Sequence, residues 1–154
     1  MGRIDDRLKE LGIELPEAPQ PIANYVGAVR AGSLIFLSGR GPRQAGEWVS
    51  RGKLGQDVTV EEGYQAARLT ALNLLATLKA EVGDLDRVKR VVKLLGMVNS
   101  VPDFTDQPNV INGASDLLVE VFGERGRHAR SAFGAAALPM NTSVEVELVV
   151  EVED

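Results

Sequence analysis

The chain contains no cysteine and only one histidine, His128, among its 154 residues. Without cysteine it has no disulfide framework, no thiol nucleophile and no cysteine-ligated zinc or iron–sulfur site. One histidine cannot supply the paired ligands of an H-E-x-x-H helix or a facial metal triad, and a Ser-His-Asp relay would have to be built around His128. We therefore expect neither a metal nor a cofactor.

The chain has fewer basic than acidic residues. Its 17 Lys and Arg residues and 22 Asp and Glu residues give a net charge of -5 and a pI near 5.0. This balance works against nonspecific binding to a polyanion or an anionic membrane surface, so nucleic acid is disfavoured as a partner. The apolar runs are too short to cross a bilayer, and the charged first residues hold no apolar signal core. We expect a cytoplasmic protein without a membrane partner.

A length of 154 residues with 44% hydrophobic residues suits one domain whose core holds the fold without cross-links. Residues 3–11 predict a short polar helix that ends at Gly12, and prolines keep the following segment extended. We place an N-terminal helix and extended arm at residues 1–21 and the main domain at residues 22–154.

The pattern along the main domain predicts an α+β fold. We expect strands at residues 25–29, 34–38, 87–98, 130–138 and 144–152, one helix after the capping box of Thr59 and Glu62, and another after Asp106. This order suits a mixed β-sheet with two helices on one face.

The strand at residues 87–98 carries apolar side chains on both of its faces. Two helices cover only one face of a sheet, so the other face needs a different cover. A second copy of the same sheet is the natural candidate. We therefore expect a homo-oligomer.

The last strand alternates, so its glutamates share one face. Glu145 and Glu151 are expected to be solvated there, whereas a glutamate partly desolvated in an oligomer interface would have a raised pKa suited to proton transfer. If this strand forms a hairpin with the strand before it, Glu147 lies on the same face as Arg130. A gap for a small molecule would then separate the guanidinium from the carboxylate.

Such a pair has a chemical use, because an arginine fork holds a carboxylate by two hydrogen bonds while a facing carboxylate handles water or a proton. Arg130 is equally compatible with a surface ion pair, or with a phosphate clamp formed together with Arg125, Arg127 and His128. The glycine-rich turn at residues 39–42 lacks the P-loop lysine and spacing, which makes it a weak candidate for phosphate binding.

Several segments together resemble a known family. They are HARSAF at residues 128–133, LP at 138–139, VEVE at 144–147, NY at 24–25, LIFLSG at 34–39 and PDF at 102–104, followed by Asn112. The chain resembles the RidA/YjgF family of reactive intermediate deaminases, also labelled endoribonuclease L-PSP, over residues 22–152. Its N-terminal helix and longer loop are similar to the YjgF/chorismate-mutase-like subgroup.

The resemblance implies a chorismate-mutase-like α+β fold, assembled as a homotrimer with sites in the clefts between subunits. It implies that Arg130 binds the carboxylate of a 2-imino acid and that Glu147 positions and activates water. It further implies that Tyr25, Ser38 and Asn112 line the pocket. Hydrolysis of the imine would release ammonia and a 2-oxo acid.

The chain also departs from the family pattern. His128 precedes Ala129 where the family usually has Pro-Ala, Ala132 stands where it commonly has cysteine, and the residues around Tyr25 differ. A second class of function therefore stays open, a non-catalytic trimer that binds a small carboxylate metabolite. RNA cleavage, which one family label names, fits poorly with an acidic chain and a lone histidine.

Overall fold

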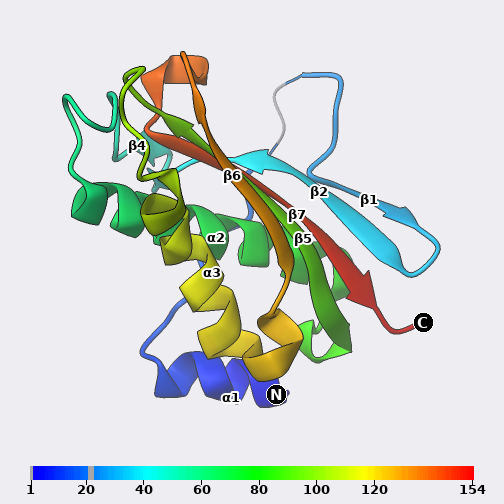
Figure 1. Cartoon of the computed structure of the whole chain (residues 1–154). Coiled ribbons are helices and arrows are strands. Elements are labelled where there is room, and N and C mark those ends of the chain that lie inside the picture. The colour runs from blue at the N-terminus through cyan, green and yellow to red at the C-terminus, as the bar shows by residue number, and fades with distance from the viewer. Residues whose placement is uncertain (1, 21–22) are drawn as a thin grey trace.

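The last strand lies at the centre of the sheet, and its alternating valines and leucines point to one buried face. The computed structural model describes residues 2–20 and 23–154, and its main sheet has the order β1 (Ala28–Ala31), β2 (Leu34–Arg40), β7 (Val144–Val152), β5 (Val88–Asn99), β6 (Ala129–Ala135) (Figure 1). β5 and β6 run parallel and the other neighbours run antiparallel. The predicted mixed α+β fold is confirmed.

Helices cover one face of this sheet, as predicted. They are α2 (Val60–Val82) and α3 (Gln107–Phe122), with α1 (Arg3–Glu10) at their end and the 3-10 turns η1 (Leu85–Arg87), η2 (Gly123–Gly126) and η3 (Pro139–Asn141) between elements. The capping box before α2 forms: the Glu62 N–H donates to the Thr59 hydroxyl, and the Thr59 N–H donates to the Glu62 carboxylate, both at 3.1 Å. The loop after β2 carries a small hairpin of β3 (Arg43–Gln44) and β4 (Glu47–Trp48).

The prediction that the last two strands form a hairpin is wrong. β5 lies between β6 and β7, because α3 carries the chain back so that β6 pairs in parallel with one side of β5 while β7 pairs with the other side. The strand also stops at Ala135 rather than residue 138. The register predicted from a local turn therefore does not exist, and the Arg130–Glu147 pair that depended on it does not form within one subunit.

The second face of the sheet carries apolar side chains that nothing in the described structure covers. Val29, Phe36 and Phe133 are 55%, 47% and 45% exposed. The ladder places Phe36 beside Val149 and Phe133 beside Met97, all on the face away from the helices. We call this surface the open face. The homo-oligomer expected to cover it stays a prediction.

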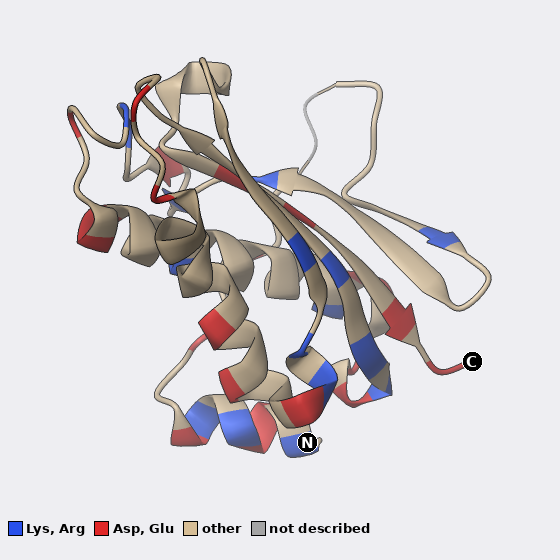
Figure 2. Ribbon diagram, viewed as in Figure 1, with Lys and Arg blue, Asp and Glu red and all other residues tan. Residues whose placement is uncertain are grey.

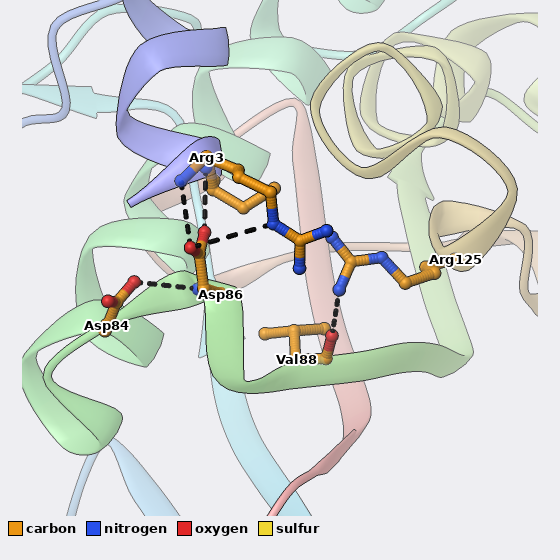
Figure 3. A network of polar contacts seen from close by, with 6 residues as sticks. Arg3, Asp84, Asp86, Val88 and Arg125 are labelled. Carbon is orange, nitrogen blue, oxygen red and sulfur yellow. Dashed lines mark hydrogen bonds and ion pairs between the residues drawn. The ribbon is translucent and has the colours of Figure 1, made fainter. Parts of the chain in front are cut away.

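The N-terminal helix docks on the main domain. Ile4 and Leu8 are buried in the common core, although the rest of α1 carries both basic and acidic residues (Figure 2). Asp86, in η1, accepts hydrogen bonds from the backbone N–H groups of Arg3 and Ile4 at 2.8 Å each (Figure 3). It thus caps α1 from a distant part of the chain, because Gly2 at the N-cap has no side chain.

We predict that Asp86→Ala lowers the free energy of unfolding at pH 7 by about 1 kcal/mol. The N–H of Ile4, and then that of Arg3, hold the pKa of Asp86 below its ordinary value. A depressed pKa gives stability above the unfolded value near pH 4 that is lost as the pH falls through the folded pKa. Urea denaturation at pH 7 and at pH 3 should therefore show a smaller acid-induced loss in the variant.

The exposed Asp103 offers a matched control, since Asp103→Ala should behave as wild type at both pH values. Equal acid sensitivity of wild type and Asp86→Ala would contradict the capping role.

The predicted boundary between arm and domain, at residues 21 and 22, lies outside the described residues. No helix in residues 2–20 and 23–154 is long and apolar enough to span a bilayer.

Candidate active site

Arg130 lies on the edge strand β6 and turns toward the helices. It stands beside Leu94 of β5, whose side chain is fully buried under the helices, so Arg130 shares that face. Its Nη1 donates to Asn112 Oδ1 at 2.8 Å and to Ser115 Oγ at 3.2 Å. The structure thus brings together two predicted site residues, Arg130 and Asn112, beside an open hollow of about 280 Å³.

His128 fixes the orientation of this arginine through a serine. The His128 Nδ1–H donates to the carbonyl of Gly126 at 2.6 Å, which leaves Nε2 as an acceptor 2.9 Å from Ser115 Oγ. The Ser115 hydroxyl therefore donates to His128 and accepts from Arg130. Burial, with Arg130 nearby, lowers the pKa of His128, which keeps the ring neutral near pH 7. Sequence reasoning missed Ser115, three residues after Asn112 on the same helical face.

Only some of the other basic residues of this loop line the hollow beside Arg130. Arg125 Nη1 donates to the carbonyl of Val88 at 2.7 Å (Figure 3), and Arg127 forms an ion pair with Glu124 at 3.1 Å. His128 is engaged with Ser115. Arg127, His128 and Arg130 line the same hollow, whereas Arg125 is bonded to Val88 and does not line it, so the four-residue phosphate clamp considered from the sequence does not form.

A second group of site residues lies at the other end of the sheet. Tyr25, Gly39, Arg40 and Glu145 line a cavity of about 360 Å³, which we call the Arg40 cavity. Tyr25 is 49% exposed beside it. The Ser38 hydroxyl already donates its hydrogen bond within the chain, because its Oγ donates to the carbonyl of Val26 at 2.6 Å. That bond ties the segment after Tyr25 to β2.

Glu145 and Glu151 of β7 are half-buried, whereas Glu147 is exposed. Burial, and next the charge of Glu147, raise the pKa of Glu145. A Cβ on Gly39 would lie 3.2 Å from the Glu145 carboxyl carbon, so the carboxyl rests against a backbone that has no side chain. The expectation that Glu145 is solvated is wrong. The place of Glu145 beside Tyr25 was not predicted either, because alternation alone does not distinguish between glutamates that share one face.

Arg130 and the glutamates lie on opposite faces of one subunit's sheet. In the pairing of β6 with β5, Arg130 lies beside Leu94. In the pairing of β7 with β5, Glu147 lies beside Leu95 and Glu145 lies beside Met97. Leu94 points to the helices, and its neighbour Leu95 points to the open face. A substrate bound to Arg130 therefore cannot reach either carboxylate of the same chain.

Comparisons with known proteins agree with this architecture. Residues 5–152 match the family described as "YjgF/chorismate_mutase-like, putative endoribonuclease". Protein TCP17 of Trypanosoma cruzi is 49% identical, over 99% of this chain and 96% of that protein. The 2-iminobutanoate/2-iminopropanoate deaminase of Dermatophagoides farinae is 30% identical, over 92% of this chain and 95% of that protein.

A solved structure of similar sequence supports the same conclusion about the fold. A protein of unknown function from Agrobacterium tumefaciens is 49% identical and superposes with a TM-score of 0.91, over 97% of this chain and 92% of that chain. The match therefore includes the docked N-terminal helix as well as the sheet. The chain belongs to the YjgF/chorismate-mutase-like family.

Proposed function

We propose that the protein is a 2-imino acid deaminase, which hydrolyses reactive imines to 2-oxo acids and ammonia in clefts between the subunits of a homotrimer. The observation that carries the proposal is the division of the site into two ordered halves. One half holds Arg130 and Asn112, and the other holds Tyr25 and Glu145. The deaminase from Dermatophagoides farinae, a relative of this chain, bears the name of such a reaction.

The open face supplies the reason for placing the site between subunits. Its exposed Phe36 and Phe133 favour burial against a second copy. Arg130 lies on the edge strand β6, so it is positioned to reach across a subunit boundary. A neighbour packed on the open face would bring the Arg130 of one copy toward the Tyr25 and Glu145 of another.

The proposed chemistry needs little more than positioning and proton transfer. Arg130 holds the carboxylate of the imino acid by charge-assisted hydrogen bonds. Glu145 accepts a proton from water as the oxygen adds to the imine carbon, and it donates this proton to the imine nitrogen, which gives a carbinolamine. Glu145 then takes the proton of the carbinolamine hydroxyl and passes it to the nitrogen as the carbon–nitrogen bond breaks. Water and imine are consumed, and a 2-oxo acid and ammonia are released. We assign the role predicted for Glu147 to Glu145, because its raised pKa suits a group that both takes and returns a proton.

The test is to generate 2-iminopropanoate in situ and follow its disappearance with wild type, Arg130→Ala and the exposed control Arg51→Ala. Wild type and Arg51→Ala should exceed the spontaneous rate, and Arg130→Ala should lose about 10²-fold, the equivalent of two charge-assisted hydrogen bonds. A spontaneous rate with wild type would contradict the enzyme proposal. Carboxylate binding without turnover would favour the non-catalytic class instead.

Sedimentation equilibrium tests the assembly on which this site depends. A trimer at micromolar concentration is the expected result, because the open face is expected to be buried by neighbouring copies. A stable monomer would contradict the shared site, since Arg130 and Glu145 lie on opposite faces of one sheet.

A further inference from the structure

Arg40, at the end of β2, holds a positive charge that the described structure does not neutralise. Its Nε and Nη2 are buried and have no hydrogen-bond partner among residues 2–20 and 23–154. A Cβ on Gly27 would lie 2.7 Å from Nη2, so the guanidinium packs closely against backbone. Burial lowers the pKa of Arg40. A buried charge without a partner is unfavourable, and proteins retain one where a ligand compensates it.

A second guanidinium faces the same cavity. Arg43 Nε is also buried without a partner in the described part of the chain, and its Cζ lies 5.2 Å from the centre of the Trp48 ring. Buried Asn73 of α2 donates to the carbonyls of Gly41 and Arg43 at 3.1 and 2.9 Å. The loop that carries Arg43 is therefore held in place. Two cations are thus kept close together before any ligand binds.

The carboxyl of Glu145 lines the cavity but does not neutralise this pair. Within the described residues no ion pair joins it to Arg40 or Arg43. Its own pKa is raised by burial and by Glu147, not lowered by an arginine. The Arg40 cavity therefore contains two guanidinium groups and one carboxyl, which leaves a net positive charge for a small anion to balance.

We propose that the Arg40 cavity binds a carboxylate group and that the protein therefore prefers ligands with a second acidic group, as in a 2-imino dicarboxylic acid. A planar carboxylate matches a guanidinium fork, whereas the nearby Glu145 disfavours the doubly charged phosphate. Trp48 and Tyr25 offer an apolar wall for a short carbon chain. The substrate class rests on the proposed function, because Arg130 of a neighbouring copy would hold the first carboxylate.

Trp48 is the only tryptophan of the chain and lines the cavity, so its fluorescence reports binding directly. We would titrate wild type, Arg40→Gln and the exposed control Arg51→Gln with succinate, butanoate and inorganic phosphate. Succinate and butanoate have four carbons each and differ by one carboxylate. Wild type and Arg51→Gln are expected to bind succinate saturably. Wild type should bind butanoate at least about tenfold more weakly than succinate, and Arg40→Gln should bind succinate more weakly than wild type by the same factor. Each difference corresponds to the loss of one charge-assisted contact.

Thermal unfolding separates a binding role of Arg40 from a structural one. Without ligand, Arg40→Gln should melt at or above the wild-type temperature, because the change removes an unpaired buried charge. Succinate should raise the melting temperature of wild type and not that of Arg40→Gln. If the glutamine variant does not fold, Arg40→Lys keeps the charge without the fork and should still weaken succinate binding.

Three results would overturn the inference: equal succinate affinity in wild type and the Arg40 variants, tighter binding of phosphate than of succinate, or no preference for succinate over butanoate. These readouts do not depend on turnover. Succinate binding without imine hydrolysis would overturn the proposed function alone. If the protein hydrolyses the imine but binds succinate equally well with and without Arg40, the inference about the Arg40 cavity alone would be overturned.

Discussion

Glu145→Gln is expected to bring imine hydrolysis close to the spontaneous rate, a loss of about 10²- to 10⁴-fold, which is the usual contribution of a positioned general base. Glutamine keeps the size and the hydrogen-bonding shape of the side chain but cannot take a proton from water. Glu147→Gln is the matched control. Its carboxylate is exposed on the same strand, so turnover should stay near wild type. Initial rates on 2-iminopropanoate, with the spontaneous rate subtracted, measure both effects.

This pair of variants also decides between the two glutamates. Loss of activity in Glu147→Gln with full activity in Glu145→Gln would restore the assignment made from the sequence. Unfolding does not explain the expected loss, because Glu145→Gln removes a half-buried charge next to Glu147. The melting temperature of the variant should therefore equal or exceed that of wild type, as thermal unfolding would show.

Gly113→Ala is expected to cause the largest loss of stability among single methyl additions in the helices. Gly113 lies where α3 approaches α2, and a Cβ there would overlap the backbone carbonyl oxygen of Tyr64. Backbone cannot move aside as a side chain can, so the two helices must separate. Overpacking of this kind costs about 1–3 kcal/mol and outweighs the gain of about 1 kcal/mol in helix propensity from glycine to alanine.

Gly63→Ala, in α2, is the matched control for this substitution. A Cβ at Gly63 would lie 3.0 Å from side-chain methyl groups of Leu54 and Val110, a milder overlap that a small side-chain shift relieves. Urea denaturation should show Gly113→Ala less stable than Gly63→Ala by about 2 kcal/mol. Equal stabilities would contradict the close contact. Because Asn112 and Ser115 flank Gly113, the destabilised variant should also lose alignment of Arg130.

Local sequence signals predicted most elements of the fold. The capping box of Thr59 and Glu62 located the start of α2, and Asp106 located the start of α3. The strands expected at residues 25–29 and 34–38 were also found, although β1 begins at Ala28 rather than residue 25. These features depend on hydrogen bonds and backbone angles of neighbouring residues, which a short stretch of sequence determines.

The features that sequence reasoning missed depend on contacts between distant segments. Whether β6 pairs with β5 or β7 is decided by the path of α3, and a wrong choice of partner changes which side chains share a face. For the same reason the burial of Glu145, the network of Ser115 and His128, and the unpaired charge of Arg40 carried no local signal. The residues expected at the site lie in two separate groups, and this grouping was not predicted.

The proposed catalytic site takes Arg130 from one subunit and Glu145 from another. The direct test mixes two inactive variants, Arg130→Ala and Glu145→Gln, by unfolding and refolding them together. Random assembly of equal amounts leaves about one intact site in four, because each site takes one residue from each of two subunits. The mixture should therefore regain about a quarter of the wild-type rate of 2-iminopropanoate hydrolysis. A mixture that stays as inactive as its separate components, although the subunits have exchanged, would contradict the shared site.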